Sequence, residues 1–215
     1  VAQGFGVPLR TAIPALASGL LTRTIADLKK SHPRLSMSIQ VDTSDVLVQA
    51  LLQDQLDVVL GRIPGGARAE ELLFDSLGEE ELCVVAGAQH PMANATELGW
   101  AEMQNMTWVL QQHPSPMRSI INQVFHNARV DIPSSIVETT SIMTLLSLVQ
   151  QTDMLGVTPL SVVEDYPGRH LLAVLPIKFE ARLPPYGLIT RRHRIQSSAM
   201  QAFMNSVRAE HALSK

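Results

Sequence analysis

The chain has 215 residues, of which 46% are hydrophobic and 17% charged, and its formal net charge is −3 at pH 7. These values are typical of a globular protein with one large domain or two small ones. The acidic balance argues against a fragment that binds nucleic acid by itself, because that task needs a basic face. No apolar stretch approaches the roughly 20 residues of a membrane span, and no signal peptide is visible. We therefore expect a piece of a larger cytoplasmic protein.

The first part of the chain alternates between strand and helix periodicities. Residues 7–13 look extended, and apolar residues then follow helical spacing over 16–31. Residues 35–41 alternate as a strand, and Thr43-Ser44-Asp45 supplies the N-cap of the next helix. The run 56–60 predicts a strand buried on both faces. This β-α-β-α-β order predicts a parallel sheet with right-handed crossovers.

The remainder of the chain predicts a second set of the same kind after a loop over 64–80. The expected strands are 81–86, 107–110, 134–138, 155–158, 171–175 and 184–190. The expected helices lie near 96–104, from about 116, over 141–151, around 159–166 and at the carboxyl terminus. Two such sets, with a late strand and helix, predict two lobes. The chain would cross between them twice, near 82–87 and 185–190.

Enzyme signatures are missing from the sequence. The nucleophile elbow, the phosphate-binding loop, the dinucleotide fingerprint and the zinc-protease motif are all absent. The single cysteine, Cys83, excludes internal disulfides, and its apolar context LCVVA predicts a buried, inert thiol. We therefore expect no enzymatic activity, no cofactor and no bound metal.

Arg62 is the first candidate for a functional residue, because it directly follows the predicted strand 56–60. Ligands of open α/β sheets bind at the carboxyl ends of the strands. Arg62 could therefore contact a ligand, or it could simply extend from the edge of the core into solvent.

Hydroxyl residues recur where a strand is followed by a helix. They are Ser18, Thr43, Ser44, Ser115, Thr139, Thr140 and Ser141. Each is explained by helix capping alone. Several helix N-termini directed into one cleft would instead hold an anion, because their free N–H groups carry partial positive charge.

Several segments, taken in order, resemble the effector-binding domain of LysR-type transcriptional regulators. They are HPRLSMSIQVDTSDVLVQALLQDQLDVVLGR (32–62), LCVVAGAQHPMA (82–93), SIVETTSIMTLLSLV (135–149), LGVTPLSVV (155–163) and YGLITRRHR (186–194). The resemblance covers nearly the whole chain. It implies an α/β, two-lobed periplasmic-binding-protein-like (type 2) fold with two crossover strands. Lobe I would comprise 1–85 and 187–215, and lobe II 86–186.

The resemblance also implies the site. A small organic anion would bind in the interlobe cleft as effector and change DNA binding through rearrangement of the oligomer. The implied effector-binding residues are Ser18, Ser44, Arg62, Ser115, Thr139 and Thr140. One departure concerns Ala15, because the family commonly carries a serine or threonine at that place; Ser18, one helical turn later, could substitute for it.

The partners follow from the same resemblance. The family's N-terminal winged helix-turn-helix and linker helix are expected to be absent from this chain, so DNA would be bound only through them. The fragment is expected to dimerise through the helix 16–31 and the adjacent sheet edge, and the full-length protein to form a tetramer. No membrane association is expected. The alternatives are a free solute-binding protein of a transport system and, more distantly, an enzyme on the same scaffold.

Overall fold

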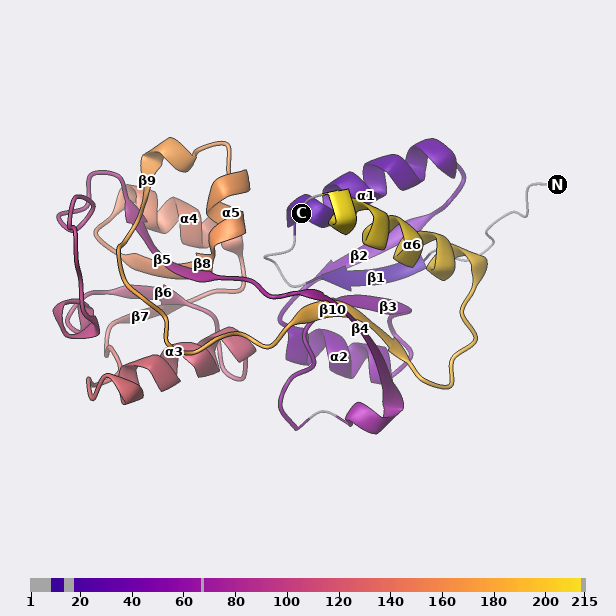
Figure 1. The fold of residues 1–215 in the computed structure, drawn as a ribbon, viewed down its shortest axis with the longest axis horizontal. Coiled ribbons are helices and arrows are strands. Elements are labelled where there is room, and N and C mark those ends of the chain that lie inside the picture. Colours follow the sequence, from indigo (N-terminus) through magenta and orange to yellow (C-terminus); the bar gives the residue numbers. More distant parts are fainter. Residues whose placement is uncertain (1–8, 14–17, 67, 214–215) are drawn as a thin grey trace. The chain divides into compact units, whose positions relative to one another are not determined.

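The computed structural model describes residues 9–13, 18–66 and 68–213. The chain divides into two compact units, each built on its own five-stranded mixed sheet (Figure 1). The first unit runs to Glu79 and resumes at Pro185, and the second is Glu80–Pro184. The predicted α/β fold with two lobes is therefore confirmed.

The sheet of the first unit has the strand order β2-β1-β3-β10-β4. Strands β2, β1 and β3 are parallel, whereas β10 is antiparallel to both β3 and β4. The elements are β1 (Leu9–Ile13), α1 (Ser18–Ser31), β2 (Met37–Val41), α2 (Ser44–Leu52), β3 (Val58–Gly61), the 3-10 helix η1 (Ala69–Glu71), β4 (Leu72–Gly78), β10 (Tyr186–Arg191) and α6 (Ser198–Leu213).

Both faces of this first sheet are covered, which explains the continuous apolar run of β3. Val58 and Leu60 pack with α1 and α6 on one face, and Val59 packs with α2 on the other (Figure 1). Successive strand residues point to opposite faces, so a strand buried on both sides needs no polar position. The prediction of a doubly buried strand is confirmed, with β3 beginning at Val58 and not at Leu56.

The second unit repeats this plan with the strand order β7-β6-β8-β5-β9. Strands β7, β6 and β8 are parallel, and β5 is antiparallel to β8 and β9. The elements are β5 (Leu82–Gly87), the 3-10 helix η2 (Trp100–Met103), β6 (Trp108–Leu110), α3 (Pro116–Asn127), β7 (Ile136–Glu138), α4 (Ile142–Gln151), β8 (Leu155–Pro159), α5 (Leu160–Asp165), the 3-10 helix η3 (Arg169–Leu171) and β9 (Leu172–Val174). Helix α3 covers one face of this sheet, and α4 and α5 cover the other (Figure 1).

Two sequence-based expectations were wrong in detail. Strand β4 lies inside the predicted loop 64–80. It is an edge strand in which only Leu72 and Leu77 are buried, so it lacks the apolar pattern of a core strand. The lobe boundary was also misplaced. Strand β5 pairs with β8 and β9, so residues 80–85 belong to the second unit, and Pro185 and Tyr186 belong to the first.

Strand β2 leaves an apolar edge exposed. Its predicted alternation placed Leu35, Met37, Ile39 and Val41 on one face. Leu35 is buried, but Ile39 and Val41 are 44% and 55% exposed. Because β2 is the outermost strand of its sheet, it pairs with β1 on one side only, and its other side is available for pairing.

Cys83 lies in β5 and is buried, as predicted. Burial, together with the charges of Glu81 and Glu164, raises the pKa of the thiol to about 12. Since the thiolate is the reactive form, we expect Cys83 to react with a disulfide reagent at about pH 8 at least about a hundredfold more slowly than an exposed cysteine does. Timed labelling of the native chain, with the urea-unfolded chain as reference, measures this. Equal labelling rates in the native and the unfolded chain would contradict the burial of the Cys83 thiol.

No helix in the described part of the chain is long and apolar enough to span a bilayer. Within 9–13, 18–66 and 68–213, histidine, cysteine and carboxylate side chains form no group of three that could hold a metal ion.

Candidate functional site

Ser44 and Arg62 are brought together at the carboxyl ends of the first unit's parallel strands. Arg62 directly follows β3, and Ser44 is the first residue of α2, which follows β2. The main-chain N–H of Arg62 donates a hydrogen bond to Ser44 Oγ over 3.2 Å. Both residues are 4% exposed. The hydroxyl of Ser44 therefore fixes the backbone on which the Arg62 side chain is mounted.

The capping role expected of this segment is only partly present. Thr43 is the N-cap residue of α2, but its side chain makes no capping hydrogen bond. The hydroxyl of Ser44 reaches instead to the end of β3. Ser44 thus connects two strand ends of the sheet, which capping alone would not require.

Tyr186 is a neighbour of Arg62 that sequence reasoning missed. The guanidinium carbon of Arg62 lies 5.9 Å from the centroid of the Tyr186 ring, within the range of a cation–π interaction. The Tyr186 hydroxyl lies 3.2 Å from His211 Nδ1. Tyr186 belongs to β10, which returns to this sheet from the far end of the chain and pairs with β3. No local pattern around Arg62 could have indicated a partner so distant in sequence.

Ser115 caps helix α3 in the second unit. Its Oγ accepts a hydrogen bond from the main-chain N–H of Arg118 over 3.1 Å, and Ser115 is 2% exposed. The predicted capping role is confirmed. One lone pair of the hydroxyl oxygen is used in this bond, and an anionic ligand would accept from the hydroxyl hydrogen or from the other N–H groups of the first helical turn.

Arg118, which was not predicted as a site residue, connects the strand ends of the second unit. Its Nη1 donates to Glu138 Oε1 over 2.8 Å and to the main-chain oxygen of Gln111 over 3.0 Å. These bonds join the end of β6, the end of β7 and the start of α3. Arg118 is 6% exposed.

Thr139 and Thr140 follow β7 and are both half-buried. The main-chain N–H of Thr139 donates to Leu110 O, and its Oγ1 accepts from the N–H of Ser141. Ser141 in turn caps α4 by accepting from Thr144 N. Arg118 therefore links the segment that carries Thr139 to the helix that begins after Ser115. Ser18 opens α1, and Ala15 lies outside the described residues.

The geometry defines a class of fold: two α/β units, each with polar side chains at the carboxyl ends of its own parallel strands. Residues 10–212 match the family model of the LysR substrate binding domain. The chain therefore belongs to the LysR substrate binding domain family.

Individual relatives agree with this assignment. The chain is 27% identical over 198 residues to the HTH-type transcriptional regulator GbpR of Azospirillum brasilense, which covers 92% of this chain and 58% of that protein. It resembles the regulatory domain of Synechocystis CcmR in complex with 2-PG, with a TM-score of 0.81, 17% identity and coverage of 94% and 96%. It also resembles the BenM effector binding domain with its effector benzoate, with a TM-score of 0.72, 19% identity and coverage of 96% and 93%. The chain spans about half the length of the curated relatives it matches.

Proposed function

We propose that this chain is the effector-sensing domain of a LysR-type transcriptional regulator and that its effector is a small organic anion. The observation that carries the proposal is the pairing of Ser44 with Arg62 at the carboxyl ends of β2 and β3. A guanidinium there suits a planar carboxylate, because it can donate two parallel hydrogen bonds. Benzoate, the effector named for BenM, is such a carboxylate. Ser18, Ser115, Thr139 and Thr140 are proposed as further effector contacts.

The burial of Arg62 sets a condition on this proposal. With 4% of its surface exposed, the side chain can meet a ligand only if the ligand displaces part of its surroundings. The ring of Tyr186 is one such neighbour. Effector binding should therefore be accompanied by a local rearrangement around Arg62.

A thermal-shift screen tests the proposal directly. Organic acids, their amides and matched amines are added to the 215-residue chain, and any stabilising compound is confirmed by calorimetry. A ligand at a hundred times its Kd stabilises a fold by about 2.7 kcal/mol, which a melting curve resolves. We expect the stabilising compounds to be carboxylates or other anions. If only neutral or cationic compounds stabilise the chain, the anion assignment is wrong.

The regulator as a whole would act in the cytoplasm and bind DNA through its N-terminal domain, with the effector changing the arrangement of subunits. With a net charge of −3, the effector domain has no counterion-release term to drive DNA binding. A mobility-shift assay of this chain should show no sequence-specific retention of a promoter fragment at physiological salt. Specific retention would contradict this division of roles.

Self-association is proposed for the edge formed by α1 and β2. The exposed Ile39 and Val41 on an unpaired edge strand suit burial against a second copy. Sedimentation velocity at micromolar concentration should show a dimer, and Val41→Arg should shift it to monomer. Val174→Arg is the matched control, because Val174 is 44% exposed but lies in β9 of the second unit. A monomeric parent chain would contradict the proposal.

A further inference from the structure

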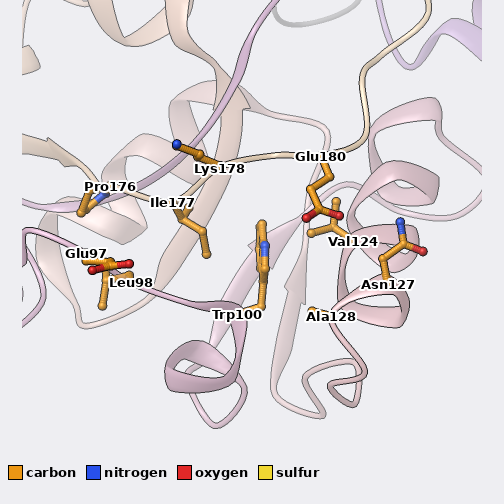
Figure 2. Close-up of a pocket in the computed structure, with 10 residues that line it drawn as sticks. All are labelled: Glu97, Leu98, Trp100, Val124, Asn127, Ala128, Pro176, Ile177, Lys178 and Glu180. Atoms are coloured by element: carbon orange, nitrogen blue, oxygen red, sulfur yellow. The ribbon is translucent and has the colours of Figure 1, made fainter.

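A cavity in the second unit is lined by none of that unit's candidate effector residues, Ser115, Thr139 and Thr140. Its volume is about 300 Å³, the lower end of the range for small-molecule sites. Three segments line it (Figure 2): the residues leading into η2, the last turn of α3, and the chain after β9. Helix α3 has 12 residues and is therefore roughly 18 Å long. The cavity is at its carboxyl end, whereas Ser115 caps its amino end.

The apolar part of the lining centres on Trp100, which is held in a fixed position. Its indole packs edge-to-face with Phe125 and Phe179 at centroid distances of 5.2 and 5.1 Å. It also stacks on Trp108 at 6.3 Å. Val124 and Ile177 lie on either side of Trp100 in Figure 2. This rigid aromatic and aliphatic surface can receive a small apolar group without ordering a mobile side chain.

The charged part of the lining is predominantly negative. Glu97 and Glu180 contribute carboxylates, against one ammonium from Lys178. Figure 2 shows the Glu180 carboxylate on the side of Trp100 and Val124, while the Lys178 side chain extends away from Trp100. Within the described part of the chain, neither carboxylate has a hydrogen bond or an ion pair. The carboxyl end of α3 adds the partial negative charge of its terminal carbonyl groups.

We propose that this cavity binds a small organic ammonium ion that carries an apolar group. The ammonium would pair with Glu180, and the apolar group would pack against Trp100, Val124 and Ile177. An indole also attracts a nearby cation through its ring electrons. The site is distinct from the effector site, so the proposal does not depend on the assigned effector.

Three probes of the same shape and different charge test the charge preference: 2-phenylethylamine, 2-phenylethanol and phenylacetate. The chain contains two tryptophans, Trp100 and Trp108, and both belong to this aromatic cluster. Intrinsic fluorescence therefore reports on the cavity directly, and calorimetry gives the affinity. We expect the amine to change the tryptophan emission and to bind at least about tenfold more tightly than the alcohol or the acid. Its affinity should fall as ionic strength rises.

Glu180→Gln locates the site, because it removes the charge while keeping the shape of an exposed side chain. We expect it to weaken amine binding by roughly three- to tenfold and to leave the alcohol unaffected. Glu164→Gln is the matched control, since Glu164 is an exposed glutamate of the same unit outside the cavity. Circular dichroism verifies that both variants are folded. The proposal is overturned if the amine gives no tryptophan signal, if phenylacetate binds as tightly, or if Glu180→Gln and Glu164→Gln behave alike.

Discussion

Replacing Asp57 by alanine is expected to lower the free energy of unfolding by about 3 kcal/mol, the largest stability effect of any single change considered for this chain. Asp57 is 7% exposed and immediately precedes β3. Its carboxylate accepts hydrogen bonds from the main-chain N–H of Arg10 over 2.7 Å and from the Arg10 guanidinium over 2.8 Å. A further bond comes from Arg194. Removing the Asp57 carboxylate leaves the guanidinium groups of Arg10 and Arg194 without the acceptor that they share.

The expected loss of stability lies at the lower end of the range for a broken buried ion pair, because the two arginine partners are partly solvated. The side chains of Arg10 and Arg194 are 36% and 22% exposed, so water compensates part of the loss. Asp57→Asn should cost less, about 2 kcal/mol, since it keeps one oxygen as an acceptor.

The effect should depend on pH. Burial by itself raises the pKa of Asp57, but the hydrogen bonds from Arg10 and the charges of Arg194 and Arg10 outweigh it, so the pKa is lowered from its usual 3.8. A carboxyl whose pKa is lowered by folding stabilises the native state above its ordinary pKa, and this contribution is lost as pH falls through the folded value. The difference between parent and Asp57→Asn should therefore shrink below about pH 4.

Urea unfolding followed by circular dichroism measures these differences. Both tryptophans lie in the second unit, so fluorescence alone would miss a change confined to the first. Asp75→Ala is the control, because its ion pair with Arg208 joins side chains that are about half exposed. Such pairs contribute about 0.5 kcal/mol or less. If Asp57→Ala unfolds at the same urea concentration as Asp75→Ala, the Arg10–Asp57–Arg194 cluster does not stabilise the fold.

Strands β3 and β4 show which parts of the fold could be predicted from the sequence. The doubly buried strand β3 was predicted because Val58, Val59 and Leu60 leave no polar position. Strand β4 was not predicted, because only two of its seven residues are buried and its neighbour β10 comes from more than a hundred residues later. Local periodicity reports burial well, but it carries no information about pairing between distant segments.

The same limit applies to the candidate site. Arg62 and Ser44 were predicted from their position at strand ends, and the structure places one against the other. Tyr186 and Arg118 were missed, since their roles arise from contacts across the fold. From the sequence alone, Arg118 is an ordinary polar residue of an amphipathic helix. Its role follows only from its hydrogen bonds to Gln111 and Glu138 in the structure. Polar residues that position others leave no periodic signal.

Arg62→Ala is expected to weaken binding of an anionic effector by about tenfold to a hundredfold, which corresponds to the roughly 1.5–3 kcal/mol of a charge-assisted hydrogen bond shielded from water. The fold should be retained. The hydrogen bond to Ser44 is made by the main-chain N–H of Arg62, which alanine keeps, and the buried residues of β3 precede this position. Ser44→Ala should cost less, about 1 kcal/mol, because it removes one neutral hydrogen bond.

Calorimetry with an anion found in the thermal-shift screen measures these effects in parallel with Arg34→Ala. Arg34 is exposed and lies in the same unit, so its removal changes the net charge equally without touching the candidate site. Arg62→Lys adds a second comparison, because it keeps the positive charge but cannot donate two parallel hydrogen bonds. A loss in Arg62→Ala that lysine restores only in part, with Arg34→Ala unchanged, indicates direct contact with the anion. Tight binding by Arg62→Ala would mean that Arg62 pairs only with groups of the protein itself and that the anion is held elsewhere.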